Sequence, residues 1–202
     1  MIGIFIEPNK ELKIHINKWK NKINKKFIRT KLTLHPPHST IYYANLIKDK
    51  DILNVLEATV KTIDSFRISV NKTLIFYDDE LTGGDTMCLL INKNDELFQI
   101  QKKIAESLKF FIKKNSNAKQ KFTNKALSTS VKKYGYPFVG KHWLPHFTIG
   151  SIKNKRNSSE FKQFTKEKVK FTNNINYISA WKISGNKHVL IKRFKLRINE
   201  KN

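Results

Sequence analysis

Cysteine is almost absent from this chain of 202 residues, because Cys88 is the only one. A single cysteine excludes an intramolecular disulfide and fits a reducing compartment. Cys88 lies in the apolar run TMCLLI at 86–91, which favours a small buried side chain over a nucleophile. No stretch approaches the roughly eighteen apolar residues of a membrane span. The apolar run in the opening MIGIFIEPNK is too short for a signal peptide and follows no basic residue. We therefore expect a cytoplasmic protein that does not enter a membrane.

Acidic residues are also scarce, with 16 Asp and Glu against 40 Lys and Arg, so the formal net charge is +24. Such a surplus predicts a polyanionic partner, because lysines beside phosphates release counterions. An AT-rich genome that encodes Lys and Asn freely would produce the same surplus. Apolar residues at 39% and aromatic residues at 11% exclude a disordered basic tail.

Hydrophobic periodicity predicts alternating strands and helices. A strand at 1–7 precedes a helix at 11–26. The expected elements that follow are a strand at 39–46, a helix at 49–64, strands at 66–77 and 86–92 joined through DDELTGGD, a helix at 94–114, a second strand around 146–151, a helix near 158–167, and strands near 168–183 and 187–197 with a turn at Gly185-Asn186. The lysine-rich stretch 115–133 is either partly helical or a functional loop.

The predicted elements repeat in order, since each half gives a helix, a PHxTI strand, a helix and a β-hairpin. This order indicates an internal duplication of an α+β unit. The halves are approximately 9–92 and 95–197, and no linker rich in Pro, Gly or Ser separates them. We therefore expect one bilobal domain over residues 1–202, and a monomer.

The repeated stretch is PHSTI at 37–41 and PHFTI at 145–149, in a chain with six histidines and five prolines. Side chains alternate between the two faces of a strand, so His38, Thr40 and Tyr42 should share one face. His146, Thr148 and Gly150 should share a face of the second strand. Two such strands can present two imidazoles and two hydroxyls to one bound group across a groove.

Two alternatives compete with a shared site. Both strands can be purely structural, although buried imidazoles then need partners. The spacings His35-x2-His38 and His142-x3-His146 also occur in zinc sites. Two prolines interrupt the first pair, and no Cys, Asp or Glu lies near either motif, so we expect no metal and no other cofactor.

Paired His and Thr side chains suit phosphodiester cleavage without a metal. A neutral imidazole takes a proton from water or from a ribose hydroxyl, and a protonated one gives a proton to the departing oxygen. The threonine hydroxyls hold the non-bridging oxygens as negative charge develops. The sequence does not distinguish which histidine is the acid and which is the base.

At these residues the chain resembles the 2H phosphoesterases, which include 2′-5′ RNA ligase-like proteins and cyclic phosphodiesterases. Their signature is two H-x-[T/S]-h tetrads, with h apolar, matched here by HSTI at 38–41 and HFTI at 146–149. The approach FVGKHWLPHFTIGS at 138–151 is also similar. The resemblance implies a bilobal α+β fold with antiparallel sheets that line a central groove and helices outside.

The resemblance further implies metal-independent action on phosphodiesters beside a ribose 2′-position. It assigns proton transfer to His38 and His146, and phosphate binding to Thr40 and Thr148. The expected activity is hydrolysis of 2′,5′-phosphodiester or 2′,3′-cyclic phosphate bonds in RNA ends or short oligonucleotides. The rivals are a nuclease that trims RNA 3′ ends, an RNA-end binding module without turnover, and a metal-dependent phosphatase.

Several residues beside the motifs are candidates for substrate binding. Aromatic rings there can stack a nucleobase, as single-stranded RNA sites often do, and a lysine can contact a phosphate. Each is as well explained as part of the core or of a groove wall. The candidates are Tyr42, Tyr134, Tyr136, Lys141 and Trp143.

Overall fold

A single sheet runs through the molecule and carries both repeated motifs. A computed structural model describes residues 1–27, 31–47, 51–113, 122, 124–185 and 187–198. The strands in these residues are β1 (Ile2–Ile6), β2 (Ser39–Ala44), β3 (Phe66–Asp79), β4 (Gly84–Ile91), β5 (His146–Ile152), β6 (Phe171–Ile175), β7 (Tyr177–Ser184) and β8 (Lys187–Lys195).

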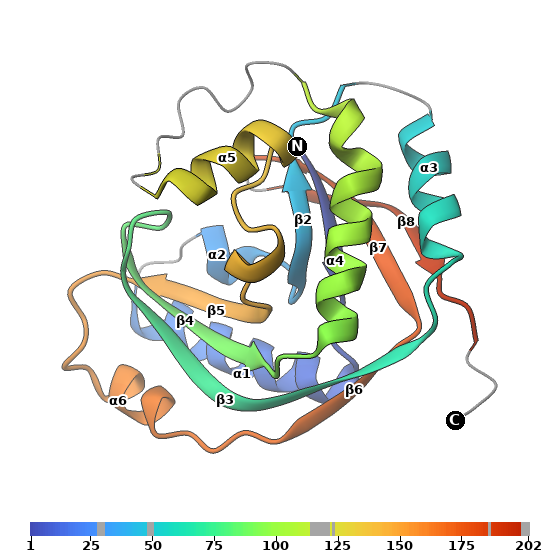
Figure 1. Ribbon diagram of the computed structural model, residues 1–202. Helices are drawn as coiled ribbons and strands as arrows, with labels where there is room; N and C mark the ends of the chain where they lie inside the picture. The colour runs from blue at the N-terminus through green and yellow to red at the C-terminus, as the bar shows by residue number, and fades with distance from the viewer. Residues whose placement is uncertain (28–30, 48–50, 114–121, 123, 186, 199–202) are drawn as a thin grey trace.

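The two motif strands are the central pair of this sheet. Within the described residues eight strands form one sheet in the order β6-β3-β4-β5-β2-β1-β7-β8. Every neighbouring pair is antiparallel, so the α+β class is confirmed, with one sheet where several were expected. Three strands flank the β5-β2 pair on each side, and Figure 1 shows both near the centre of the molecule.

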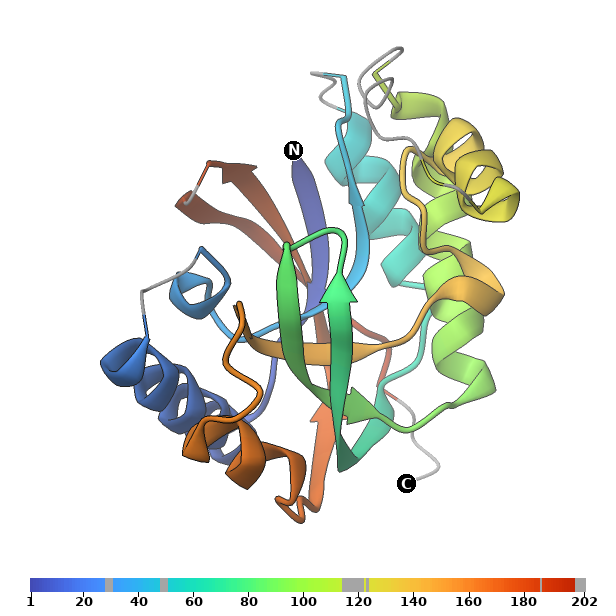
Figure 2. The ribbon, with the colours of Figure 1, turned by 90° about the vertical axis from the view of Figure 1, so that its left-hand side faces the viewer.

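Helices lie on both sides of the strands. Figure 2 shows α1, α2 and α6 on one side, and α3, α4 and α5 on the other. Their bounds, with those of two 3-10 turns, are α1 (Lys10–Lys26), α2 (Lys31–Leu34), α3 (Asp51–Val60), α4 (Asp95–Leu108), η1 (Lys109–Phe111), α5 (Lys125–Tyr134), η2 (Gly140–His142) and α6 (Ser159–Thr165). The packing crosses over between the halves, because α1 and α2 contact β5 while α4 contacts β2.

Polar side chains cap the N-termini of several helices. Asn94 is the N-cap of α4, where its side-chain oxygen accepts a hydrogen bond from the Glu96 amide, and Ser158 caps α6 in the same way. Asp95 and Glu96 then occupy the positive first turn of α4. The inner face of α4 is apolar and fully or nearly fully buried, which fixes the helix against the sheet. The residues of this face are Leu97, Ile100, Ile104, Ala105 and Leu108.

Both motif strands contain an irregularity at the same point. In the β1–β2 pair, Ile4 lies opposite Tyr42 but Phe5 lies opposite Thr40, so Ile41 is an extra residue. In the β4–β5 pair, Met87 lies opposite Gly150 but Cys88 lies opposite Thr148, so Ile149 is extra. Each extra residue interrupts the alternation of faces. The fourth residue of each tetrad is thus a β-bulge.

The partly helical alternative for the stretch 115–133 is confirmed, and one other region differs from the sequence prediction. The stretch 115–133 contains helix α5, which Asn124 caps and Gly135 ends with a left-handed φ of 63°; residues 114–121 and 123 lie outside the described residues. The predicted strand near 168–183 is two strands, β6 and β7. β6 pairs with β3 and β7 pairs with β1, toward opposite ends of the strand order. Asn186 of the predicted turn and residues 49–50 of the predicted helix also lie outside the described residues.

No helix in the described part of the chain is both long enough and apolar enough to cross a bilayer.

Candidate active site

The two motif strands meet where their histidines begin. Ser39 of β2 pairs with Phe147 of β5, and both side chains are fully buried in the core. His38 and Thr40 flank Ser39 on the opposite face, as His146 and Thr148 flank Phe147. Antiparallel pairing at this point sets His38 across from Thr148 and Thr40 across from His146.

One cavity of about 570 Å³ takes in this junction. Its volume lies within the range of pockets for small molecules and nucleotides. All four residues expected from the tetrads line it, namely His38, Thr40, His146 and Thr148. The structure therefore brings the two sequence-distant motifs to one ligand-sized space.

The two imidazoles are held in the same way. Nδ1 of His38 lies 2.7 Å from the carbonyl oxygen of Pro36, and Nδ1 of His146 lies 2.6 Å from that of Leu144. A carbonyl oxygen only accepts, so each Nδ1 carries the proton and donates it. Nε2 of each ring is then the nitrogen available for exchange with a ligand.

The proline before each histidine has a structural reason in this geometry. Pro37 and Pro145 each lie between the histidine and the residue whose carbonyl it contacts. Proline fixes its own φ and favours an extended conformation in the residue before it, so the position of that carbonyl is largely set in advance. The repeated Pro-His pair is therefore a device that orients the ring.

The surroundings of the two rings differ in charge. Burial lowers the pKa of His38 to about 3, a bond to the Pro36 carbonyl opposes the shift, and Lys20, His188 and His35 lower it further. Burial also lowers the pKa of His146, but its carbonyl bond and the negative charge of Asp79 act to raise it. His38 thus lies near the Lys20 ammonium and His146 lies near the Asp79 carboxylate.

Aromatic rings complete the enclosure of both imidazoles. The Phe5 ring stacks on His38 with a centroid distance of 3.9 Å, and the Phe76 ring meets His146 edge-on at 5.2 Å. His188 also lies beside His38, with ring centroids 5.9 Å apart. Apolar contacts of this kind disfavour a charged ring and explain the direction of both pKa shifts.

Of the predicted substrate-binding residues, Tyr136 and Trp143 line the cavity. Trp143 is 3% exposed, and its Nε1–H donates to the Thr40 carbonyl at 2.9 Å, so it also ties the approach to the second motif onto the first motif strand. Burial raises the pKa of the Tyr136 hydroxyl, which is therefore neutral at working pH.

The structure does not bring the other three candidates into the cavity. Tyr42 is fully buried in the core, where its hydroxyl donates to the Tyr134 carbonyl at 2.6 Å. The bulge at Ile41 turns Tyr42 away from the face of His38 and Thr40, and Tyr43 lines the cavity instead. Tyr134 is buried and donates to Glu106, while Lys141 is exposed outside the cavity.

Sequence reasoning missed several residues of the cavity. Lys20 lies on the apolar face of α1, and the helical spacing of the apolar residues would have placed it there from the sequence alone. Asp79, Thr82 and Thr86 come from the β3–β4 hairpin, and both threonine hydroxyls donate to Asp79 Oδ2, at 3.1 and 2.6 Å. No local pattern marks these hairpin residues, because they reach the site through strand pairing.

The histidine pairs with zinc-like spacing do not form a metal site. Among the described residues, no group of three or more His, Cys, Asp or Glu side chains is placed to hold a metal ion.

The profile of the 2′-5′ RNA ligase superfamily matches residues 8–186, which is most of the chain and includes both tetrads. The chain belongs to this superfamily. No curated protein matches it closely enough to add a more specific relationship. The two tetrads and the cavity between them are thus features of a 2H phosphoesterase.

Solved structures agree with this assignment at the level of the fold. The protein TT0787 of Thermus thermophilus has a TM-score of 0.62 at 12% identity, with 98% of this chain and 99% of that chain covered. LigT of E. coli, in its complex with NADP+, has a TM-score of 0.53 at 9% identity, with 97% and 96% covered. A structure described as a phosphoesterase has a TM-score of 0.53 at 9% identity, with 97% of both chains covered.

Proposed function

We propose that this chain is a metal-independent phosphodiesterase that hydrolyses 2′,5′-phosphodiester or 2′,3′-cyclic phosphate bonds in RNA ends or short oligonucleotides. Membership of the superfamily implies phosphodiesterase activity on RNA ends in general. The observation that carries the proposal is the matched pair of imidazoles that line one cavity, each held through Nδ1 by a carbonyl two residues before it. Hydrolysis of a phosphodiester without a metal needs a general base for the attacking water and a general acid for the leaving oxygen. Two histidines that line one cavity can fill both roles.

His38 is the general base in this proposal and His146 is the general acid. Burial, with a smaller contribution from Lys20, keeps His38 neutral, so its Nε2 can take a proton from water as the oxygen of that water forms a bond to phosphorus. Burial lowers the pKa of His146 too, but the Leu144 carbonyl and Asp79 oppose that shift, and no positive group lowers it further. We therefore assign the proton to His146, whose Nε2–H gives it to the leaving oxygen as the P–O bond breaks. Thr40 and Thr148 hold the non-bridging oxygens, where charge develops in the transition state.

The cavity also has the means to recognise a nucleotide. Tyr43, Tyr136, Phe138 and Trp143 give it an aromatic wall, and bases stack on such rings. E. coli LigT has been solved with NADP+ and with 3′-AMP, and nucleotide ligands in a protein of the same fold support a nucleotide here.

The same proposal includes one bilobal domain over 1–202, built from the two halves 9–92 and 95–197. Three features support an approximate two-fold relation: the motif strands are central, each carries a bulge at the fourth tetrad residue, and helices of each half pack on the motif strand of the other half, α1 and α2 on β5 and α4 on β2. The site then lies at the junction of the halves.

A substrate panel tests the proposal. It contains 2′-5′ and 3′-5′ linked oligonucleotides, 2′,3′-cyclic ends and cyclic dinucleotides, each incubated with chelator, and the readout is which bond breaks and where the phosphate remains. We expect turnover of a 2′-5′ linked or 2′,3′-cyclic substrate that persists with chelator. Cleavage of 3′-5′ ends alone would favour a trimming nuclease, and binding without cleavage would favour an RNA-end binding module.

Single variants test the assigned roles. His38→Ala and His146→Ala should each lower kcat by roughly 10²–10⁴, the usual cost of a lost proton-transfer group. A substrate with sulfur in place of the leaving oxygen needs no protonation on departure, so it should restore much of the rate of His146→Ala but not of His38→Ala. Equal rescue of both variants would contradict the acid and base assignment, and wild-type rates in both would contradict the site.

A further inference from the structure

Lys20 is a charged residue on the buried face of α1. Its neighbours on that face, Ile16 and Ile23, are fully buried, and Lys20 itself is 4% exposed. Its ammonium donates to the carbonyl oxygens of Leu32 at 2.9 Å and His35 at 2.7 Å, which lie at the end of α2. These bonds use two of its three N–H donors.

Lys20 also lines the cavity between the tetrads. Among the described residues that line it, Lys20 is the one Lys or Arg, and Asp79 is the one Asp or Glu. Asp79 accepts hydrogen bonds from Thr82 and Thr86 and favours the protonated form of His146. The fixed charges therefore divide between the two histidines, with the cation on the side of His38.

The ammonium acts on both halves of the site. It disfavours the protonated form of His38, and it interacts with the Cys88 thiol, whose sulfur lies 3.9 Å from the Thr148 hydroxyl. Lys20 is therefore close to the residues on which a bound phosphate would rest. Burial lowers the pKa of Lys20 to about 8, so the ammonium form still predominates at pH 7.

We propose that Lys20 is the cation that binds a non-bridging oxygen of the substrate phosphate between Thr40 and Thr148. The proposal rests on the proposed function for the identity of the bound group. The rival account is structural, in which Lys20 only ties α1 to the end of α2. A buried cation is costly, and an ion that also meets a phosphate gains a compensating interaction that the structural account lacks.

The first test compares Lys20→Met with Lys18→Met, a position on the same helix outside the cavity. Inorganic sulfate is the probe, because its charge is constant from pH 6 to pH 9. We expect Lys20→Met to weaken sulfate binding by about tenfold to a hundredfold, the scale of one hydrogen bond to a charged group, while Lys18→Met binds as the wild type. We also expect the nuclear magnetic resonance titration of His38 to move to higher pH in Lys20→Met alone.

The second test uses proteins that keep the native charge. Sulfate binding to the wild type should weaken above pH 8, as Lys20 loses its proton, whereas Lys20→Arg should keep binding to pH 9 because guanidinium stays charged. This comparison remains informative if Lys20→Met fails to fold. Circular dichroism and a thermal midpoint measured on each variant separate a lost fold from a lost ligand.

Unchanged sulfate affinity in a folded Lys20→Met, with an unmoved His38 titration, would overturn the proposal and leave Lys20 as a structural tie. In the wild type, sulfate binding that does not change between pH 7 and pH 9 would do the same. The two proposals fail separately. If no panel substrate is cleaved but sulfate binding depends on Lys20, the hydrolase is wrong and the anion site stands. If a panel substrate is cleaved, and Lys20→Met binds sulfate and cleaves that substrate as the wild type does, the hydrolase stands and the role of Lys20 is wrong.

Discussion

At the scale of single residues, the two histidines are distinguished by what surrounds them. Both rings donate from Nδ1 to a carbonyl, so hydrogen bonding alone makes them equivalent. The difference comes from more distant charges, Lys20 at His38 and Asp79 at His146. Roles that look interchangeable in the sequence are thus separated by residues that lie outside both motifs.

The lowered pKa of His38 predicts how stability changes with pH. The ordinary histidine pKa is 6.5 and that of folded His38 is about 3. Below pH 6.5 the unfolded chain binds a proton that the folded protein does not, so the free energy of unfolding falls as pH falls. His38 should contribute about 1.4 kcal/mol of this loss per pH unit down to its folded pKa.

Urea unfolding of the wild type and of His38→Gln from pH 8 to pH 4 measures this contribution. At pH 8 the imidazole is neutral in both states, so the difference between the proteins reports lost packing only. As pH falls below 6.5, we expect His38→Gln to become progressively more stable relative to the wild type. A difference that stays constant to pH 4 would mean that His38 titrates as it does in the unfolded chain.

The sequence predicted the four tetrad side chains of the site and missed the residues that make them unequal. His38, Thr40, His146 and Thr148 stand out because the chain repeats them, and a repeat is visible without coordinates. Asp79 has no such signal, because its role depends on which strand pairs with which. The lysine at position 20 is visible on an apolar helix face, but only the structure relates it to His38.

At the scale of elements, the two bulges explain why the predicted faces are wrong for Tyr42 in the first strand and for Gly150 in the second. Strict alternation places Tyr42 on the same face as His38 and Thr40. Because Ile41 is an extra residue, Tyr43 lies on that face and lines the cavity, and Tyr42 points into the core. The periodicity of the chain identified most strands and helices, because apolar spacing follows the secondary structure. A bulge adds a residue without changing composition, so the sequence of a strand does not reveal it.

Close packing of α2 against β5 gives a prediction at this scale. A Cβ at Gly150 would lie 2.8 Å from the Thr33 Cγ2 atom of α2, nearer than ordinary contact. Because both sites are buried, Gly150→Ala should push α2 outward and lower the free energy of unfolding by about 1–3 kcal/mol.

The matched control is the double variant Gly150→Ala with Thr33→Ser. Serine lacks the Cγ2 methyl that meets the added Cβ and keeps the hydroxyl, so the double variant should recover most of the lost stability. Urea denaturation of the two single variants and the double variant completes the cycle. Additive losses, with no recovery in the double variant, would show that Thr33 is not the obstacle.

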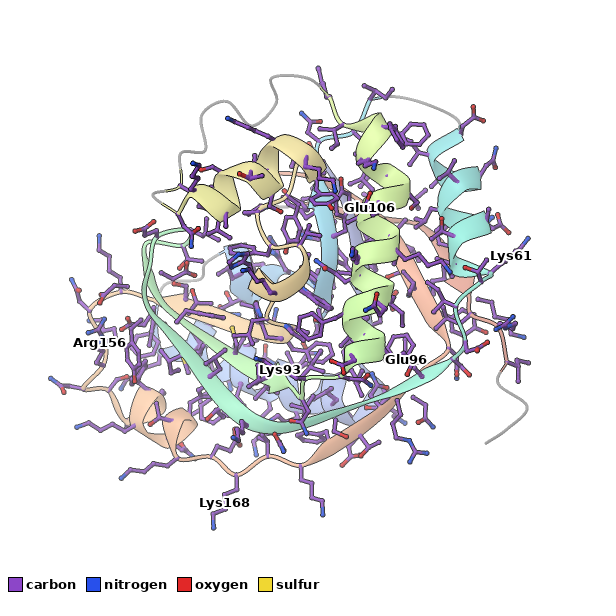
Figure 3. The ribbon with its side chains drawn as sticks, in the orientation of Figure 1. Lys61, Lys93, Glu96, Glu106, Arg156 and Lys168 are labelled. Atoms are coloured by element: carbon purple, nitrogen blue, oxygen red, sulfur yellow. The ribbon has the colours of Figure 1, made fainter. Side chains whose placement is uncertain are left out.

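At the scale of the whole molecule, two neighbouring segments hold 14 of the 40 Lys and Arg residues. Helix α1 carries seven lysines and one acid, and residues 153–170 carry seven basic residues and two acids. The two segments are held together, because the Trp19 ring meets Phe164 edge-on and its Nε1–H donates to Glu167 at 2.6 Å. Figure 2 shows α1 beside α6, and Figure 3 shows Lys168 extending outward. We call these two segments the basic face.

The basic face connects to the cavity through the β3–β4 hairpin. Arg156 pairs with Asp85 at 2.7 Å and with Asp78 at 2.6 Å, while Asp79, next in the chain, lines the cavity. If the substrate is an RNA strand whose end occupies the cavity, we expect it to continue past Arg156 onto the lysines beside it in the chain, Lys153 and Lys155. An AT-rich genome explains the number of lysines as well as RNA binding does. The two explanations differ in what they predict for the binding of an oligonucleotide.

Salt dependence decides between them. If the basic face binds the strand, KM for an oligonucleotide should rise roughly twentyfold between about 50 and 200 mM salt, as expected for about three phosphate contacts on a single strand. KM for a cyclic mononucleotide, which fills only the cavity, should change far less. Lys153→Gln with Lys155→Gln should flatten the oligonucleotide dependence, whereas Lys102→Gln with Lys103→Gln, an equal charge change on the exposed side of α4, should not. Equal slopes for both substrates, or for both double variants, would mean that the lysine surplus reflects composition and not substrate binding.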